Sequence, residues 1–318
     1  MQNAEVKIKR AASEKFRTQG FSLDKAFQGL LVFISFVILL VLFAIVLELL
    51  RSSWLSLKTF GFSFLVSQVW DPVAEKYGAL SFIYGTLASS LIAMLIAVPI
   101  SLGSALFITQ WAPSWLRNPI SFLIELLAAI PSVIYGLWAI FVLIPFIRNT
   151  FFPSFFPLLG SIKLFEGPAY GPSLLAGGMV LSIMILPTIT SVTKEIFLTI
   201  PQEYKEGVYA LGGTQWESII WVVLRLSRSG IIGACVLGLG RAIGETMAVT
   251  MVIGNRPEVS ASIFAPAYSL ASVIANEFAE ATSPLYLSSL SKMGLLLLVI
   301  TLIVNVFARL LVGKAKKR

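Results

Sequence analysis

Two opposite charges, Arg241 and Glu245, stand inside an apolar stretch that runs over residues 230–254. A charge at the centre of a membrane-spanning helix costs roughly 2.5 kcal/mol or more, so such residues normally face protein or a water-filled cavity. If the stretch is one helix, the spacing of four residues places both side chains on the same face. Arginine presents five donors in a planar fork that matches the oxygens of an oxyanion. The pair therefore indicates either an oxyanion site or a buried ion pair that locks helices together.

A carboxylate next to the arginine favours an oxyanion that still carries a proton. Phosphate keeps a P–OH group near neutral pH and sulfate does not, and Glu245 can accept that hydrogen. The sulfate complex would leave this acceptor unpaired, which favours phosphate. Gly240 and Gly244 flank the pair, where they allow either close helix packing or close approach of the backbone to an ion. Pro131 predicts a break in an earlier apolar stretch, which makes the adjacent Ser132 a candidate contact.

The composition indicates that lipid is the main solvent of this chain. Hydrophobic residues make up 57% of the sequence and charged residues 13%, with a mean hydropathy of +0.88. A soluble domain has about 25% charged residues. The sequence has no histidine and a single cysteine, Cys235. These absences exclude histidine-ligated zinc, histidine-based catalysis and a disulfide within the chain.

Six apolar stretches are long enough to cross a membrane, which needs roughly 20 mostly apolar residues. The sequence thus predicts an all-α polytopic membrane protein with six transmembrane helices. The expected spans are residues 28–50, 84–108, 119–147, 173–198, 230–254 and 293–312. We expect a tail over 1–27, a transmembrane domain over 28–313 with a polar loop at about 199–224, and a basic tail over 314–318.

Basic residues set the orientation of these spans, because lysine and arginine concentrate in cytoplasmic segments. Six of them precede the first span and four follow the last. Both termini are therefore expected in the cytoplasm, with the protein in the plasma or inner membrane. The polar loop then also lies inside, and residues 51–83 and 255–292, with three and two basic residues, lie outside.

The polar loop predicts a short amphipathic helix at the cytoplasmic surface. Thr199-Ile-Pro201-Gln202 is typical of a capping-box start with proline in the first turn. Gly212-Gly213 is expected to end the helix. An apolar stripe is expected from Tyr204, Val208 and Leu211. A helix this short is marginal alone in water, so it packs on the ends of this chain's own helices or on a partner.

The same loop resembles the EAA loop of ABC importer permeases, with the pattern E-A-A-x-x-x-G, nine residues, then I-x-L-P. Glu206 and Gly212 match in register, whereas Gly207 stands where the family has alanine and Arg225 where it has proline. In that family the loop is a coupling helix that inserts into a groove of the ATPase subunit. The resemblance therefore implies an ATPase-coupling role for Glu206, Gly207, Ala210, Leu211 and Gly212.

Three further motifs are similar to the permease subunits of phosphate ABC importers, the PstC type, over about residue 70 to the C-terminus. They are residues 128–136, 239–249 and 275–281, in the expected order. The resemblance implies a type I importer permease that forms half of a translocation pathway. It also implies a second permease subunit (PstA-like), two ATPase subunits (PstB-like) that bind ATP and Mg, and a periplasmic or lipid-anchored phosphate-binding protein (PstS-like).

Other functions stay open at this stage. A permease for sulfate or molybdate fits the same pattern, and an ion-coupled secondary transporter or channel fits the composition. The coupling loop and the absence of a visible internal repeat disfavour the latter. We expect no enzyme activity and no cofactor in this chain, since no nucleophile–base pair or metal-ligand cluster is present. Glu277 and Glu280, in the last outer loop, are expected to dock the binding protein, to shape the outer gate, or to form a solvated face.

Overall fold

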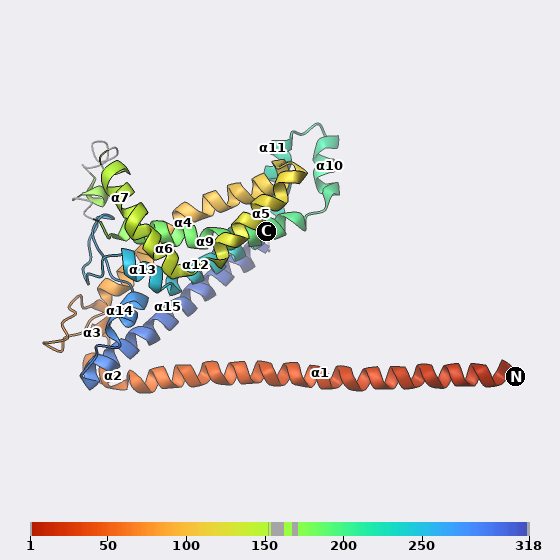
Figure 1. Cartoon of the computed structure of the whole chain (residues 1–318), viewed down its shortest axis with the longest axis horizontal. Coiled ribbons are helices and arrows are strands. Elements are labelled where there is room, and N and C mark those ends of the chain that lie inside the picture. Colours follow the sequence, from red (N-terminus) through yellow and green to blue (C-terminus); the bar gives the residue numbers. More distant parts are fainter. Residues whose placement is uncertain (1, 152, 154–161, 167–170, 317–318) are drawn as a thin grey trace. The chain divides into compact units, whose positions relative to one another are not determined.

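The structure is a computed structural model that describes residues 2–151, 153, 162–166 and 171–316 (Figure 1). These residues form helices and turns, and no β-strand is found among them. The chain divides into two units, one up to Arg51 and one from Ser52 onward. Five of the described helices are long and apolar enough to cross a membrane, or six if one bent pair counts as a single span. The predicted all-α, six-span architecture is thereby confirmed.

The first unit is one continuous helix, α1 (Gln2–Ser52). Its segment Phe27–Ser52 is long and apolar enough to cross a membrane. The predicted first span, residues 28–50, is therefore confirmed to within two residues. The segment expected as an N-terminal tail is helical and continuous with it.

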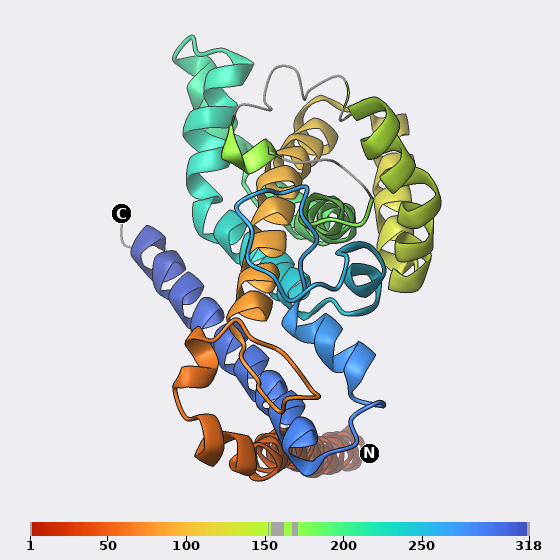
Figure 2. The same ribbon diagram turned by 90° about the vertical axis from the view of Figure 1, so that its left-hand side faces the viewer.

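The second unit is built around two long helices, α4 (Leu80–Leu106) and α9 (Leu174–Leu198), which pack against each other; in Figure 2 α9 is seen end-on beside α4. A Cβ atom on Gly178 of α9 would lie 2.5 Å from a side-chain carbon of Ile92 on α4, so only glycine allows this approach. The Ser101 hydroxyl of α4 also donates to the Leu186 carbonyl of α9 at 3.1 Å. Small residues and interhelical hydrogen bonds are the usual means by which helices associate in lipid.

The third predicted span is broken at Pro131, as expected. α5 (Ser114–Ala129) ends before the extended residues Ile130 and Pro131, and α6 (Ser132–Trp138) begins after them. Proline lacks an N–H donor and disfavours helix at the residue before it, which accounts for the break. The helical run continues through η2 (Ala139–Leu143), α7 (Ile144–Phe146) and η3 (Ile147–Phe151). The segment that can cross a membrane is Ser132–Thr150, so the predicted start of this span at residue 119 is wrong.

The fifth predicted span is also broken, and the expectation of one helix over residues 230–254 is wrong. α12 (Arg228–Gly244) ends before Glu245, which is extended with φ −70° and ψ 129°. The chain resumes as α13 (Met247–Val252). At its other end α12 follows α11 (Gln215–Ser218) and η5 (Ile219–Leu224) after a bend of 70°.

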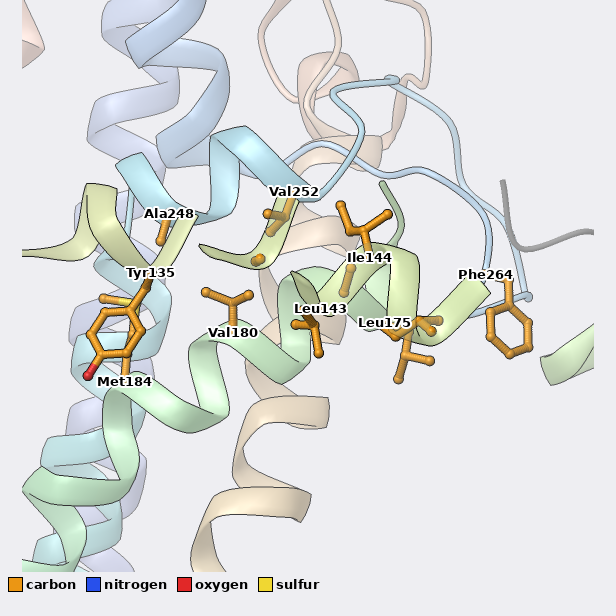
Figure 3. Close-up of a cluster of buried hydrophobic side chains, with 12 residues drawn as sticks. Tyr135, Leu143, Ile144, Leu175, Val180, Met184, Ala248, Val252 and Phe264 are labelled. Carbon is orange, nitrogen blue, oxygen red and sulfur yellow. The ribbon is translucent and has the colours of Figure 1, made fainter. Parts of the chain in front are cut away.

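The two pieces that follow these breaks, α6 and α13, pack against each other. A Cβ atom on Gly136 would lie 2.6 Å from the Met251 sulfur and 3.3 Å from the Ala248 Cα, so glycine is required at this crossing. Figure 3 shows the apolar cluster that they share with α9, which includes Tyr135, Val180 and Ala248. The cluster fixes the positions of both breaks relative to α9.

The remaining short elements are α2 (Trp54–Phe60), α3 (Ser63–Val66), η4 (Lys163–Phe165), α10 (Gln202–Ala210) and α14 (Leu270–Glu277), and the chain ends with α15 (Pro284–Lys316). Within the second unit, α10 and α11 lie at the opposite end from α2, α3 and α14 (Figure 1). This separation places the polar loop and the outer loops on opposite sides, as the predicted topology requires.

A buried lysine joins α15 to the segment α2–α3. Lys292 was expected just outside the last span, but it lies within α15 and is only 5% exposed. Its ammonium group donates to the carbonyl oxygens of Ser56 at 3.3 Å and Gly61 at 3.1 Å. It also lies 4.1 Å from the centroid of the Phe64 ring, in cation–π geometry. These contacts satisfy a charge that would otherwise be costly in this environment.

We expect Lys292→Met to lower the free energy of unfolding by about 1–3 kcal/mol, because two carbonyl groups lose their donor while the apolar stem is kept. The measurement is denaturant titration of the purified protein in detergent micelles. Lys58→Met, at an exposed position on α2, is the matched control. Equal stability of the two variants would contradict the clamping role of Lys292.

Candidate functional site

Arg241 and Glu245 are not paired with each other. An Arg241 guanidinium nitrogen donates to the Thr188 hydroxyl of α9 at 3.1 Å. The Glu245 carboxylate accepts from the backbone N–H of Ala248 at 3.4 Å, at the start of α13. Among the described residues, no ion pair involves either side chain. The prediction that they share one helix face is wrong, because the chain leaves the helix after Gly244, and the helix-locking ion pair is not formed.

Each of the two charged side chains instead lies near a helix end where the helix dipole stabilises its charge. Arg241 is in the last turn of α12, where the helix dipole favours a cation, and Glu245 lies two residues before α13, where the dipole favours an anion. Both side chains are partly exposed. The single hydrogen bond of Arg241 leaves most of its five donors for another partner. The break between α12 and α13 therefore carries a cation, Arg241, and a hydrogen-bond acceptor, Glu245, that are not bonded to each other.

Glycines near the break differ in what surrounds them. A Cβ atom on Gly230 or Gly238 would lie 2.7 Å from an isoleucine of α9, so helix packing explains these two. A Cβ atom on Gly240 or Gly244 would meet no described atom within 4 Å. Packing within the chain therefore does not explain Gly240 and Gly244, which border open space on α12.

Ser132 is the first residue of α6, and it is partly exposed. The first N–H groups of a helix lack an acceptor within the helix, so backbone donors lie at this break. Tyr135, one turn further on, donates from its hydroxyl to the Leu127 carbonyl of α5 at 2.7 Å. Its hydroxyl is also close enough to Arg241 for an electrostatic interaction. The structure thus brings the break in α5–α6 near the break in α12–α13.

Thr188, the hydrogen-bond partner of Arg241, and the nearby Tyr135 were not predicted as site residues. Thr188 follows Pro187 in an otherwise apolar stretch, and Tyr135 lies within the motif at residues 128–136.

The start of α10 differs from the predicted capping box. Pro201 is not in the first turn but at the N-cap position, with φ −59° and ψ 140°. The Thr199 hydroxyl donates backward to the Ile196 carbonyl at 2.8 Å and does not cap α10. A capping box does occur in this loop, at the start of α11, where Thr214 and Glu217 bond reciprocally. The sequence motif was therefore assigned to the wrong helix.

The apolar stripe of α10 is covered by this chain only in part. Tyr204 is 57% exposed and Leu211 is 91% exposed, while Lys205 is the one buried residue of this helix, at 8%. Glu206, Gly207 and Ala210 are exposed as well. Val208, the middle residue of the stripe, is partly buried and packs on the apolar cluster at the chain's own helix ends, whereas Tyr204 and Leu211 are left uncovered. The interpretation that the stripe packs on this chain therefore holds for Val208 alone. An outward apolar surface of this kind is typical of a partner-binding site.

Gly212 ends α10, as predicted, with φ +83°. The N–H of Gly213 donates to the Val208 carbonyl at 2.9 Å and closes the helix end. No described atom lies within 4 Å of a Cβ placed on Gly212, so backbone conformation alone requires glycine at this position.

Glu277 is engaged within the chain. Its carboxylate accepts from the Trp70 indole N–H at 2.7 Å and from the Tyr286 hydroxyl at 2.6 Å. These bonds tie the segment before α4 to α14 and α15. Glu280 is exposed. Of the two acidic residues, Glu280 is thus the one free to meet another molecule from solution.

Glu125, on α5, also has a partner within the chain. The Lys194 ammonium on α9 lies 3.9 Å from the Glu125 carboxylate and 3.3 Å from that of Glu195. This ion pair links α5 to α9 and accounts for the charge of Glu125 without a transport role.

Comparison with known proteins covers nearly the whole chain. Residues 97–317 match the family of binding-protein-dependent transport system inner membrane components. The chain is 50% identical to the phosphate transport system permease protein PstC of Mesorhizobium japonicum, over 88% of this chain and 87% of that one. It is 44% identical to the protein of the same name from Haemophilus influenzae, over 96% and 98%.

The fold also has a counterpart among solved structures. The inward-facing MetNI methionine ABC transporter matches with a TM-score of 0.53 at 17% identity, over 74% of this chain and 94% of that chain. This likeness concerns the fold alone. The chain is therefore a multi-pass membrane subunit of a transport system and belongs to the family of binding-protein-dependent transport system inner membrane components.

Proposed function

We propose that this chain is a permease subunit of an ATP-driven phosphate importer and forms half of its translocation pathway. The observation that carries the proposal is the identity of 44–50% with phosphate permease proteins over most of the chain. That alignment extends over both broken spans and the loop with α10. A fold shared with a methionine transporter is compatible with many substrates, so substrate identity rests on the closer relatives.

In this proposal phosphate is handled at the two breaks. Arg241, held by Thr188, keeps donors free for phosphate oxygens, and Glu245 accepts the P–OH hydrogen. Ser132 and the backbone at Gly240 and Gly244 complete the contact. Sulfate or molybdate is the alternative cargo, and the acceptor at Glu245 argues against an anion without a proton.

The proposed assembly contains a second permease subunit (PstA-like), two ATPase subunits (PstB-like) and a phosphate-binding protein (PstS-like). ATP and Mg are bound by the ATPase subunits, and this chain holds neither. The exposed face of α10, with Tyr204 and Leu211, supports docking of an ATPase through the loop. An ion-coupled carrier is disfavoured, because a self-sufficient carrier has no use for such a surface.

Uptake by the purified complex in vesicles tests the proposal. We expect phosphate uptake that requires ATP on the cytoplasmic side and the binding protein on the other, with little uptake of sulfate or molybdate. Co-purified subunits are identified by mass spectrometry. Equal uptake of sulfate, or uptake that persists without ATP, would reject the proposed substrate or the proposed energy source respectively.

Both termini are predicted to lie in the cytoplasm. Their basic residues and the even number of spans support this orientation. Tags placed at either end should resist protease added to intact spheroplasts and become cleavable after lysis. An engineered protease site in the exposed turn at residues 72–75 is the positive control, because that segment is predicted to be outside. Cleavage of either terminal tag in intact cells would overturn the six-span topology.

A further inference from the structure

A polar cavity of about 240 Å³ lies behind α10, between this helix and the end of α4–η1. Its lining includes Thr109, Gln110, Arg117, Gln202, Lys205 and Gln215. The Gln215 amide donates to the Gln110 carbonyl at 3.2 Å, which ties α11 to η1 (Phe107–Trp111) beside the cavity. The volume exceeds by several times the roughly 30 Å³ that one water occupies in the liquid, so it can hold a small polyatomic ion with water.

Two cations line this cavity without a counter-charge. Lys205 is 8% exposed, and no hydrogen bond or ion pair to its ammonium is found among the described residues. Arg117 uses its Nε to bond the Ala112 carbonyl at 2.9 Å, which leaves the outer nitrogens of its fork. None of the described residues that line the cavity is acidic. A lysine side chain that is buried along its length while its ammonium has no partner within the chain is unusual, because buried charges are normally paired.

The electrostatics of the cavity agree with this geometry. Burial, and secondarily the nearby positive charge of Arg117, lowers the pKa of the Lys205 ammonium. Two cations facing one space repel each other, and an anion between them would reverse both effects. A tetrahedral oxyanion suits the fork of Arg117, and the neighbouring amides and the Thr109 hydroxyl add neutral donors.

Four exposed tryptophans lie in the elements at this end of the chain's second unit. Trp111 in η1, Trp115 in α5, Trp216 in α11 and Trp221 in η5 are all exposed, and Trp111 stacks on Trp216 with ring centroids 6.0 Å apart. Exposed tryptophans are enriched at the membrane–water interface, at the depth of lipid headgroups. Phosphate groups are therefore available from two sources there, anionic lipid and free inorganic phosphate.

We propose that this cavity is a second oxyanion site, in which Arg117 and Lys205 bind a phosphate group and hold α10 against the α4–α5 corner. The site is separate from Arg241 and Glu245 and does not depend on what the pathway carries. Because Lys205 is on α10, occupancy would set the rigidity of the surface that this helix presents to a partner.

Hydrogen exchange of the assembled complex in nanodiscs tests this site. In phosphatidylcholine discs, added inorganic phosphate should slow exchange of the α10 amides several-fold, and discs containing phosphatidylglycerol should do so without added phosphate if lipid is the source. Lys205→Gln and Arg117→Gln should each abolish the protection, and Lys205→Arg should restore it. Arg225→Gln, an exposed cation outside the cavity, is the matched control and should leave the protection intact.

Two results would overturn the proposal. One is protection by phosphate that survives Lys205→Gln but is lost in Arg241→Lys, which would assign the effect to the pathway. The other is full protection of α10 in phosphatidylcholine discs without phosphate, lost only when the ATPase subunits are removed. That outcome would mean that a carboxylate of the partner fills the cavity.

Discussion

Replacement of Gly212 by valine is expected to reduce ATP-driven uptake and ATPase association by an order of magnitude or more, with membrane insertion unchanged. Gly212 has φ +83°, a conformation that costs an L-residue about 1–2 kcal/mol and a β-branched residue more. The site is open, so the cost is one of backbone conformation and not of collision. Relief of the strain would re-aim Leu211 and the exposed face of α10.

The measurement is uptake in vesicles together with the amount of ATPase that co-purifies. Gly212→Asn should retain far more of both than Gly212→Val, because asparagine tolerates positive φ. Gly207→Ala provides a second comparison, since this position is equally open but lies inside the helix. It should favour the helix by about 1 kcal/mol. Equal behaviour of the valine and asparagine variants would remove the argument from backbone conformation.

Sequence features with a local cause predicted the structure well. Proline at 131 breaks its span because it lacks an N–H donor and disfavours helix at the residue before it. Gly212 ends α10 for an equally local reason. No such signal exists at Glu245, where the break depends on packing of α13 against α6 across Gly136. Tertiary packing is not visible in the periodicity of one stretch, so the span was predicted as a single helix.

The helix α10 shows where amphipathic periodicity misleads. Apolar spacing identifies a face that avoids water, and it does not say whether this chain or a partner covers that face. Tyr204 and Leu211 lie on the outward face, while Lys205 turns inward on its long apolar stem. A subunit that functions in a complex thus presents apolar residues outward and can bury a charge.

Hydrogen bonds between residues far apart in the chain could not be predicted from a single sequence. Trp70 meets Glu277 across 207 positions, and Lys292 meets Gly61 across 231. In both cases a polar group of the segment between α1 and α4 bonds to a residue on α14 or α15. The candidate pathway residues were found because charge in an apolar stretch is conspicuous, whereas Thr188, which orients Arg241, is a neutral residue without such contrast.

The prediction with the largest expected effect concerns Arg241 and Glu245. Arg241→Lys should lower phosphate uptake at least tenfold, because an ammonium cannot bond Thr188 and an oxyanion in the fork geometry of arginine. A matched double change to methionine at both positions should leave the complex folded, assembled and inactive. Since no ion pair joins the two residues, neither single variant is expected to unfold the protein by stranding its partner's charge.

The variant Glu245→Gln removes the negative charge at this break and keeps the hydrogen bond that begins α13. The amide oxygen can still accept from the Ala248 N–H, so the start of α13 is preserved while the anionic acceptor for P–OH is lost. We expect the preference for phosphate over sulfate to fall roughly tenfold, the equivalent of one charge-assisted hydrogen bond of about 1.5 kcal/mol. Uptake of both anions is measured in vesicles with the whole complex. Near-normal phosphate uptake by the methionine double variant would show that neither charge handles the ion, and an unchanged preference in Glu245→Gln would restrict that role to Arg241.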